Sequence, residues 1–522
     1  MSSRHSLNRN SSHNSYNEKA DSLNESMAEK LSRLSQKSLD SRTRSDPNSR
    51  PVGLKKSIGL FSGVALIVGT MIGSGIFISP TGVTENSGSV GLSLILWLIG
   101  GIISLLGAMS YAELGTTIRK SGGEYSYLLS AFGPLNKHVG NIPAFLFAWV
   151  NMMLLKPASV AIITLTFATY CMQPFYDVCS PPASAKRMLA ILCVLIILLI
   201  NSVSIKVATW IQNIFTVTKL VAVVIIVFTG FVLMGMGYTQ YISTGFSGTA
   251  TSAGSIAVAI YHSMWAYDGW NNLNYVTEEV IDYHRNLPRA ILIAVPLVTV
   301  CYLFMNLSYF TMMSVKELIQ SPAVAVTWGN RTLGVMSWLI PLFVACSTFG
   351  AANGTLFSSG RLNYVAAREG HMLKLLAMVQ VKTCSPMPSL IFTCLLAIIF
   401  IIPGDISSLI DFFSFAVWLF YGLTMVALII IRLKLKPEKT DDTFKVPIII
   451  PFIVLVVSLF LVVAPIIDKP RIEYLYAFLF IIGGLIFYIP FVHFKKELPG
   501  MEKFNAFFSL LLDSELPHRE ET

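Results

Sequence analysis

The sequence predicts an all-α polytopic membrane protein with twelve transmembrane helices. Its 522 residues are 54% hydrophobic and only 13% charged, with a mean hydropathy of +0.64. A soluble protein would carry about twice that share of charge. Several apolar stretches, such as 448–467 and 474–491, are long enough to cross a hydrocarbon core of about 30 Å. The net charge of +9 therefore gives no indication of a nucleic-acid partner.

The N-terminal segment differs in composition from everything that follows it. It is rich in Ser, Asn, Arg and Lys, and it lacks the apolar stretch of a cleavable signal peptide. Such a segment buries too little apolar surface to offset the entropy of ordering. We therefore interpret residues 1–53 as a disordered cytoplasmic tail, residues 54–496 as the twelve-helix domain and residues 497–522 as a cytoplasmic C-terminal tail.

Basic residues fix the predicted orientation. If the N-terminus is inside and twelve crossings alternate, about 30 of the 38 Lys and Arg residues fall on the cytoplasmic side. The six that fall outside are Lys186, Arg187, Lys316, Arg331, Lys469 and Arg471. The opposite orientation would reverse this count. Both termini are therefore predicted to be cytoplasmic.

Two predicted spans are interrupted at their centres. The span 57–79 contains Gly-Thr-Met-Ile-Gly-Ser-Gly-Ile-Phe at 69–77, and the span 255–280 contains Trp-Ala-Tyr-Asp-Gly-Trp-Asn at 265–271. A membrane span is helical unless it borders a cavity, because backbone polar groups need partners. Paired breaks, in the first and sixth of twelve spans, are typical of a five-plus-five inverted repeat with a transporter's binding site at its centre.

The first break suits a carboxylate. Gly73, Ser74 and Gly75 leave the backbone open, and glycine tolerates non-helical dihedral angles. Free N–H groups at the start of a half-helix, together with the helix dipole, favour an anion. The alternative is a packing face of small residues, Gly69 and Gly73, which is common in membrane helices.

Asp268 is the candidate group for recognising a cation. A carboxylate inside a span costs a few kcal/mol and normally faces a cavity or a partner. Its aromatic neighbours Trp265, Tyr267 and Trp270 could wall a pocket and stack on a cation. The alternatives are a structural pair with an intramembrane lysine, or a protonated Asp268. The intramembrane lysines are Lys219, whose ammonium could occupy the place of a coupling ion, and Lys156, for which snorkelling is an alternative.

The remaining motifs indicate a partner rather than catalysis. No closely spaced His and Cys ligands suggest a metal, and no nucleophile–base pair suggests an enzyme, so we expect no cofactor. Cys179 lies in a polar loop that the charge distribution places outside. An unpaired thiol on the oxidising face suggests an intermolecular disulfide.

Together these motifs resemble the light subunits of the heteromeric amino-acid transporters, in the amino acid–polyamine–organocation superfamily. The resemblance covers residues 54–496. It is carried by the two breaks and by the strings Ala-Glu-Leu-Gly at 112–115, Ser-Gly-Gly-Glu-Tyr at 121–125, Gly-Ala-Ala-Asn-Gly at 350–354 and Arg-Glu-Gly-His at 368–371. The strings at 174–182 and 265–271 are most similar to the b-zero-plus branch, whose light chains pair with the heavy chain rBAT.

This resemblance implies a LeuT-like helix arrangement and a sodium-independent antiporter in the plasma membrane, apical in epithelia. Cystine and dibasic amino acids would enter and neutral amino acids would leave. It implies that Lys219 replaces sodium, that Trp265 forms the outer gate, and that Cys179 bridges to an rBAT-like heavy chain. The substrate-binding residues would be Met71, Ile72, Gly73, Ser74, Gly75, Trp265, Ala266, Asp268 and Asn271. The alternatives are an exchanger of large neutral or aromatic amino acids in which Asp268 is structural, and a membrane amino-acid sensor without net transport.

Overall fold

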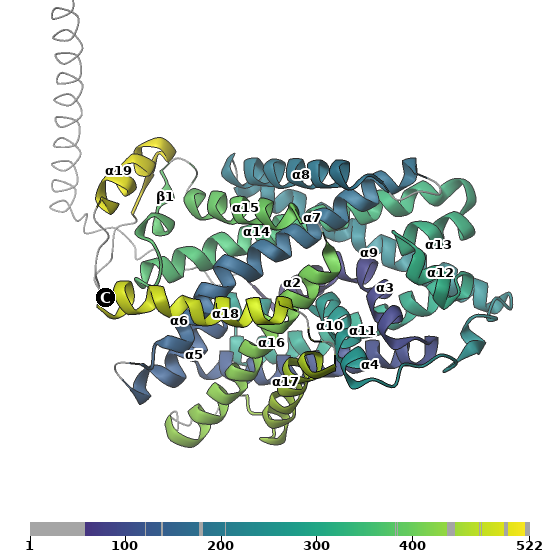
Figure 1. Cartoon of the computed structure of the whole chain (residues 1–522), viewed down its shortest axis with the longest axis horizontal. Coiled ribbons are helices and arrows are strands. Elements are labelled where there is room, and N and C mark those ends of the chain that lie inside the picture. The colour runs from purple at the N-terminus through teal and green to yellow at the C-terminus, as the bar shows by residue number, and fades with distance from the viewer. Residues whose placement is uncertain are drawn as a thin grey trace, which may run out of the picture. The chain divides into compact units, whose positions relative to one another are not determined.

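The computed structural model describes most of the chain after residue 57. The described ranges are 58–118, 120, 122–136, 139–176, 181–203, 205–381, 383, 385–403, 405–435, 444–468, 470, 472–494 and 500–516. All of them belong to one compact unit, 56–522 (Figure 1). The predicted N-terminal tail and Cys179 lie outside the described residues.

The first half of this unit is helical throughout its described spans. Its helices are α2 (Leu60–Met71), α3 (Gly75–Ser87), α4 (Val90–Thr117), α5 (Glu124–Phe132), α6 (Ile142–Val150), α7 (Lys156–Met172), α8 (Ala183–Val203) and α9 (Ile205–Gly235). A π-helical turn, η2 (Asn151–Leu155), joins α6 to α7, so that the two form one span. Short 3-10 turns follow as η1 (Gly133–Leu135), η3 (Gln173–Phe175) and η4 (Ile242–Thr244).

The second half begins with the other interrupted helix. Its helices are α10 (Ala253–Tyr267), α11 (Tyr283–Met312), α12 (Val315–Gln320), α13 (Val324–Thr332), α14 (Leu339–Arg368), α15 (Met387–Ile401), α16 (Ile406–Ile430), α17 (Ile449–Asp468), α18 (Ile472–Phe487) and α19 (Met501–Leu512). The 3-10 and π segments are η5 (Asn272–Glu279), η6 (Gly334–Trp338), η7 (Lys374–Ala377), η8 (Ile431–Leu435) and η9 (Tyr488–His493). The strands β1 (Val379–Gln380) and β2 (Ser514–Glu515) pair antiparallel.

The helices confirm an all-α polytopic membrane protein. Within the described ranges, nine helical stretches are long and apolar enough to cross a membrane, and α2 with α3, bent by 50°, makes a tenth. The helices α10 and α15 have only 15 residues each. They occupy the positions of the sixth and ninth predicted spans. The count of twelve crossings stays a prediction, because these two helices alone are short for a bilayer.

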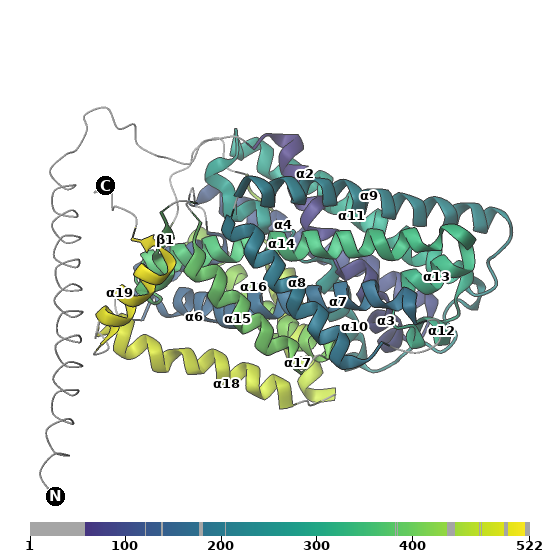
Figure 2. The ribbon, with the colours of Figure 1, turned by 90° about the horizontal axis from the view of Figure 1, so that it is seen from above.

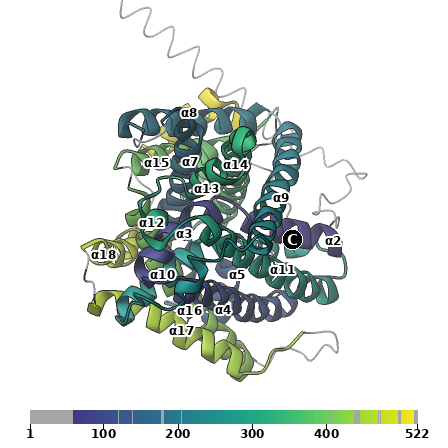
Figure 3. The same ribbon diagram turned by 90° about the vertical axis from the view of Figure 1, so that its right-hand side faces the viewer.

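Helix pairing supports the inverted repeat. The helices of the first four predicted spans each pack against their counterpart in the second half: α3 on α10, α4 on α11, α7 on α14 and α8 on α15. Two repeats related by a pseudo-two-fold axis bring such counterparts together. Figure 3, turned by 90° from Figure 1, shows the short helices α3 and α10 among the longer ones.

Burial separates central from peripheral helices. In the span 142–175, 78% of the most apolar window is buried, whereas the value for α8 is 22%. Helix α8 lies along one edge in Figure 1, and α18 lies along another in Figure 2. Their exposed side chains are apolar, as Leu195 and Leu199 on α8 and Leu475 and Leu479 on α18 illustrate. A surface of this kind suits lipid rather than water, so the central helices are the ones able to build a site.

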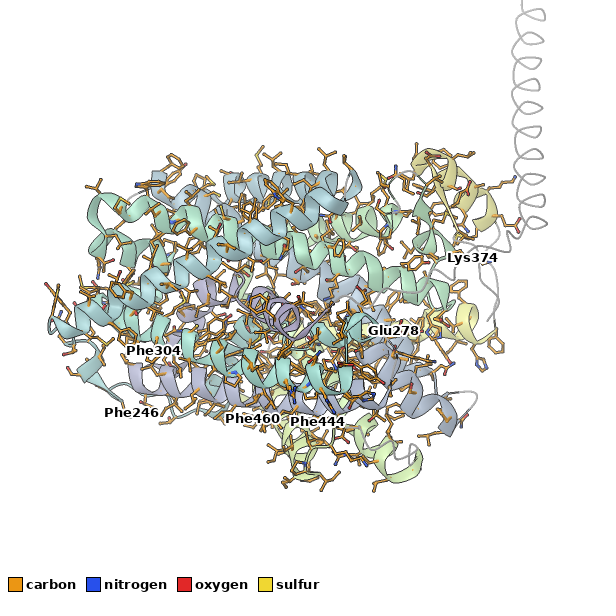
Figure 4. The ribbon with its side chains drawn as sticks, turned by 180° about the vertical axis from the view of Figure 1, so that it is seen from behind. Phe246, Glu278, Phe304, Lys374, Phe444 and Phe460 are labelled. Atoms are coloured by element: carbon orange, nitrogen blue, oxygen red, sulfur yellow. The ribbon has the colours of Figure 1, made fainter. Side chains whose placement is uncertain are left out.

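The two ends of the helix bundle carry different elements. Helices α12 and α13 lie at one end, and β1 and α19 lie at the other (Figures 1 and 2). Figure 4 places Phe246 and Lys374 at opposite ends in the same way. The predicted C-terminal tail 497–522 thus contains ordered elements, since β2 pairs with β1 and α19 packs on η7.

A buried ion pair ties three segments together at the end of α4. Arg432 donates from its guanidinium to both carboxylate oxygens of Glu113 and, at 2.6 Å, to the carbonyl of Val446. The Val446 N–H in turn donates to Glu113 at 2.9 Å. Glu113 is buried, so this network satisfies a charge that would otherwise be costly inside the protein. It fixes the end of α16 and the start of α17 beside α4.

Candidate binding site at two broken helices

The first break separates α2 from α3. Helix α2 ends at Met71, and Ile72 has a ψ angle of 81°, which is not helical. Helix α3 starts again at Gly75, with Ser74 as its N-cap. The first N–H groups of a helix have no partner within it. The break therefore presents backbone donors and the positive end of a helix dipole between the two halves of the bent helix pair, where the sequence predicts an interruption.

The second break follows α10. Asp268, the residue after the helix, has φ −57° and ψ 140°, and its N–H bonds back to the Trp265 carbonyl at 3.2 Å. Gly269 has φ +107°, a conformation that side chains with a Cβ rarely adopt. The chain continues as the 3-10 segment η5 from Asn272. The glycine thus allows the sharp turn that leaves Asp268 outside any helix.

The two breaks meet. The Tyr302 hydroxyl of α11 lies 2.6 Å from the carbonyl oxygen of Met71 and 2.9 Å from that of Ala266. These carbonyls belong to the last turns of α2 and α10, where no intrahelical donor remains. A Cβ added to Gly75 would lie 2.3 Å from the Ala266 Cα. A glycine is therefore required at position 75 for this contact between the half-helices.

Lys219 donates to another carbonyl that has no helical partner because of the first break. Its ammonium donates to the carbonyl of Gly69 at 2.5 Å, and its side chain is fully buried. The N–H of Gly73, which would bond Gly69 in a continuous helix, bonds Met71 instead at 2.8 Å. A cation at the C-terminal end of a helix is also favoured by the helix dipole. Lys219 thus holds α2 to α9 and does not line the cavity beside the breaks.

A cavity of about 460 Å³ lies against both breaks. The predicted binding residues that line it are Met71, Gly73, Ser74, Gly75, Trp265, Asp268 and Asn271. Ile72 and Ala266, each about 1% exposed, are not among the residues that line it. The volume falls within the range of small-molecule sites.

The cavity is closed toward one side and extends toward the other. Trp265 packs edge-on against Phe413 of α16, with ring centroids 4.9 Å apart, and is 6% exposed. In the other direction the lining reaches Ile58, Glu279 and Leu362. The segment at Ile58 is joined to the end of η5, since the Ile58 N–H donates to the Glu279 carbonyl at 3.0 Å. This side corresponds to the loops that the charge distribution assigns to the cytoplasm.

Glu124 and Lys156, which the sequence does not assign to the site, also line the cavity. Glu124, at the start of α5, is buried and accepts hydrogen bonds of 2.6 Å each from the Asn271 amide and the Tyr275 hydroxyl. Lys156, at the start of α7, has its ammonium 5.7 Å from the centre of the Tyr275 ring. It lies in the middle of the span 142–175 rather than at a membrane surface, so snorkelling does not describe it.

Sequence reasoning could have found part of this group. Lys156 stood out as a charge within an apolar stretch, but its direction depends on the helix face. Glu124 gave a weaker signal, because it follows Gly122 and Gly123 in what reads as a loop. Tyr302 gave none, since a tyrosine in an apolar span is commonplace. All three are brought to the breaks by helices distant in the sequence.

Two broken helices that meet beside a cavity, within a bundle of candidate membrane spans, are typical of a transporter of the permease class. Residues 58–488 match the family model described as amino acid permease. The chain belongs to this family.

Several curated relatives cover most of the chain. It is 52% identical to the b(0,+)-type amino acid transporter 1 of Mus musculus over 456 residues, which are 87% of this chain and 92% of the relative. The human protein of that name is 51% identical over the same shares. The large neutral amino acids transporter small subunit 2 of Mus musculus is 46% identical over 422 residues, 80% of this chain and 78% of the relative. The chain is thus similar to these transporters over 78–92% of their lengths.

Proposed function

We propose that this protein is a sodium-independent amino-acid exchanger that takes up cystine and dibasic amino acids in exchange for neutral ones. The observation that carries the proposal is the position of Asp268, an acidic side chain in the helix break that lines the cavity beside the first break. A carboxylate there can pair with a cationic side chain of a substrate whose own carboxylate lies at the first break. Membership of the permease family and similarity to b(0,+)-type transporters support this function.

In the proposed binding mode, the N–H groups around Gly73, Ser74 and Gly75 hold the substrate carboxylate. Carbonyl groups at the ends of α2 and α10 receive its amine, and Asp268 receives its side chain. Trp265 is the outer gate, since it already closes the cavity against Phe413. Alternating access would move the helices of spans one, two, six and seven against those of spans three, four, eight and nine.

Counterflow in proteoliposomes tests the proposal. Labelled arginine should accumulate when an unlabelled neutral amino acid is loaded inside, and should do so equally in sodium and in choline buffer. Sodium independence is expected because the Lys219 ammonium holds the end of α2. A membrane sensor would bind arginine without accumulation. A requirement for sodium would refute the role given to Lys219.

Asp268→Asn should reduce arginine exchange far more than leucine exchange. The substitution keeps the size of the side chain and removes the charge that pairs with the substrate cation, a loss of about tenfold or more in kcat/KM for arginine. Initial rates of both substrates, measured on the same vesicles, give the comparison. Equal losses for arginine and leucine would reject cation selection by Asp268.

A second candidate function is exchange of large neutral or aromatic amino acids. Two observations favour it: the 46% identity to a large neutral amino acids transporter subunit, and the presence of Lys156 on the same cavity wall as Asp268. In that case Asp268 would serve mainly as a partner of Lys156. Counterflow with arginine, leucine and tryptophan side by side distinguishes the two candidates.

We also propose a heavy-chain partner of the rBAT type, joined through Cys179. The relative named a small subunit supports a heteromeric assembly. Cys179→Ser should remove a reducible high-mass band from a non-reducing gel of cells that contain both chains, whereas Cys171→Ser, in α7, should not. Persistence of the band in Cys179→Ser would assign the bridge to another cysteine. The assembled protein is proposed to reside in the plasma membrane, apical in epithelia, with both termini cytoplasmic.

A further inference from the structure

We infer that Lys156 is a specificity-determining residue: its ammonium acts as a built-in counter-ion that lets the same cavity carry neutral as well as cationic amino acids. This inference rests on the proposed function and explains how one site could serve both substrate classes. The exchange requires that Asp268 tolerate a substrate with no positive side chain. A carboxylate left unpaired in a water-excluded site is costly.

The cavity is lined by charged residues of both signs. Among the described residues that line the cavity, Lys156 is the one cation, and Glu124, Asp268 and Glu279 are acidic. Glu279 lies where the lining extends toward Ile58, whereas Glu124 is hydrogen-bonded to Asn271 at the second break. Lys219, the other lysine within the spans, is committed to the Gly69 carbonyl and does not reach this wall. Lys156 lines the same cavity as Glu124 and Asp268, with its ammonium over the ring of Tyr275, whose hydroxyl donates to Glu124. Beside the two breaks, one positive charge therefore faces two negative ones.

The position of Lys156 keeps it available to both carboxylates. Its ammonium lies over the Tyr275 ring, and the Tyr275 hydroxyl donates to Glu124. Glu124 already accepts two hydrogen bonds, from Tyr275 and Asn271, so it depends less on Lys156 than Asp268 does. A lysine on a flexible stem, held by an aromatic face, can shift toward Asp268 without breaking a fixed hydrogen bond.

The net charge of the site differs between the arginine-bound and the leucine-bound protein. With arginine bound, its side chain and Lys156 together balance both carboxylates. With leucine bound, Lys156 leaves a single negative charge, which the hydrogen bonds to Glu124 help to stabilise. Without Lys156, leucine would face two uncompensated carboxylates, whereas arginine would face one. Removal of Lys156 should therefore penalise neutral substrates selectively and raise the preference for cations.

The test compares arginine and leucine exchange in proteoliposomes for the wild type, Lys156→Gln and Lys156→Arg. We expect Lys156→Gln to lower kcat/KM for leucine by about tenfold or more while arginine changes by less than about threefold. Lys156→Arg, which keeps the charge, should restore leucine exchange. Lys316→Gln, on the exposed helix α12, removes a cation elsewhere and should change neither substrate. An equal loss of both substrates in Lys156→Gln would overturn the inference.

A second comparison removes the Lys156 charge from a protein that already lacks the Asp268 charge. In Asp268→Asn one carboxylate is gone, so adding Lys156→Gln should change leucine exchange by no more than about threefold. A further tenfold loss of leucine exchange in the double variant would show a structural role and overturn the inference. This pair remains informative if Lys156→Gln alone does not fold. A wild type that exchanges leucine but not arginine would instead refute the proposed function itself, so the two failures are distinguishable.

Discussion

At the scale of single residues, the two breaks depend on side chains that hydrogen-bond the backbone carbonyls left without helical partners. The Tyr302 hydroxyl lies within hydrogen-bond distance of one carbonyl from each break, and the Lys219 ammonium donates to the carbonyl of Gly69. A helix interrupted inside a membrane loses bonds that no water replaces in hydrocarbon. These contacts stabilise the two breaks, which form the binding surface in the proposed function.

Gly75→Ala should prevent the two half-helices from meeting. The added Cβ would lie 2.3 Å from the Ala266 Cα, and backbone cannot yield as a flexible side chain can. Overpacking of this kind costs about 1–3 kcal/mol or more. We expect a lower melting temperature of the purified protein and loss of uptake. Gly483→Ala in α18 is the matched control, since its Cβ would meet nothing within 4 Å. Equal effects of both substitutions would contradict the close contact.

At the scale of elements, the short helices α12 and α13 lie outside the candidate spans, and an ion pair between Glu317 and Arg331 joins them. Ser314 and Glu317 form a capping box at the start of α12. Arg331, at the end of α13, donates to Glu317 at 2.9 Å and to the Met312 carbonyl at 2.7 Å. Each partner is over one-third exposed, so solvent screens the pair.

The ion pair between Glu317 and Arg331 predicts that the thermal stability of the protein depends on pH. The hydrogen bond from Arg331 lowers the pKa of Glu317 from its ordinary value of 4.5 to about 2. A lowered pKa in the folded state stabilises the protein above pH 4.5, and this stabilisation is lost as the pH falls toward 2. Because the pair is exposed, the effect should stay below about 1 kcal/mol. The difference in melting temperature between wild type and Glu317→Gln should shrink from pH 6 to pH 3. A difference that does not vary with pH would refute the ion pair.

At the scale of the whole molecule, the structure represents one state of a cycle. The cavity reaches Ile58 and Leu362 on one side, while Trp265 and Phe413 close the other. Alternating access requires a second state in which this seal opens and the wide side closes. Both states would share the central site at the two breaks.

Cysteine labelling tests the direction of opening. Ser358 lines the cavity, whereas Ser414 is 2% exposed and lies next to Phe413 on α16, beside the seal. In a background without native cysteines, Ser358→Cys should react quickly with a water-soluble thiol reagent applied from the cytoplasmic side. Ser414→Cys should react slowly under the same conditions. Equal rates would mean that the described state does not dominate in the membrane.

The sequence by itself determined the class of fold and the positions at which two helices break. Low charge and long apolar stretches required membrane helices, and Gly73 to Gly75 with Asp268 and Gly269 marked where two of them break. Those signals are local, because hydropathy and glycine content act on neighbouring residues of the chain. For the same reason seven of the nine predicted binding residues could be placed on the cavity.

Only the tertiary structure decided which distant side chains join that site. The sequence could not show that Tyr302, Glu124 and Lys156 face the breaks, because a helix directs each side chain through its packing against other helices. It also could not show that Ile72 and Ala266 are absent from the cavity lining. In a membrane the apolar pattern does not distinguish lipid-facing from core-facing sides. The charge balance around Asp268 is therefore a property of the assembled helices.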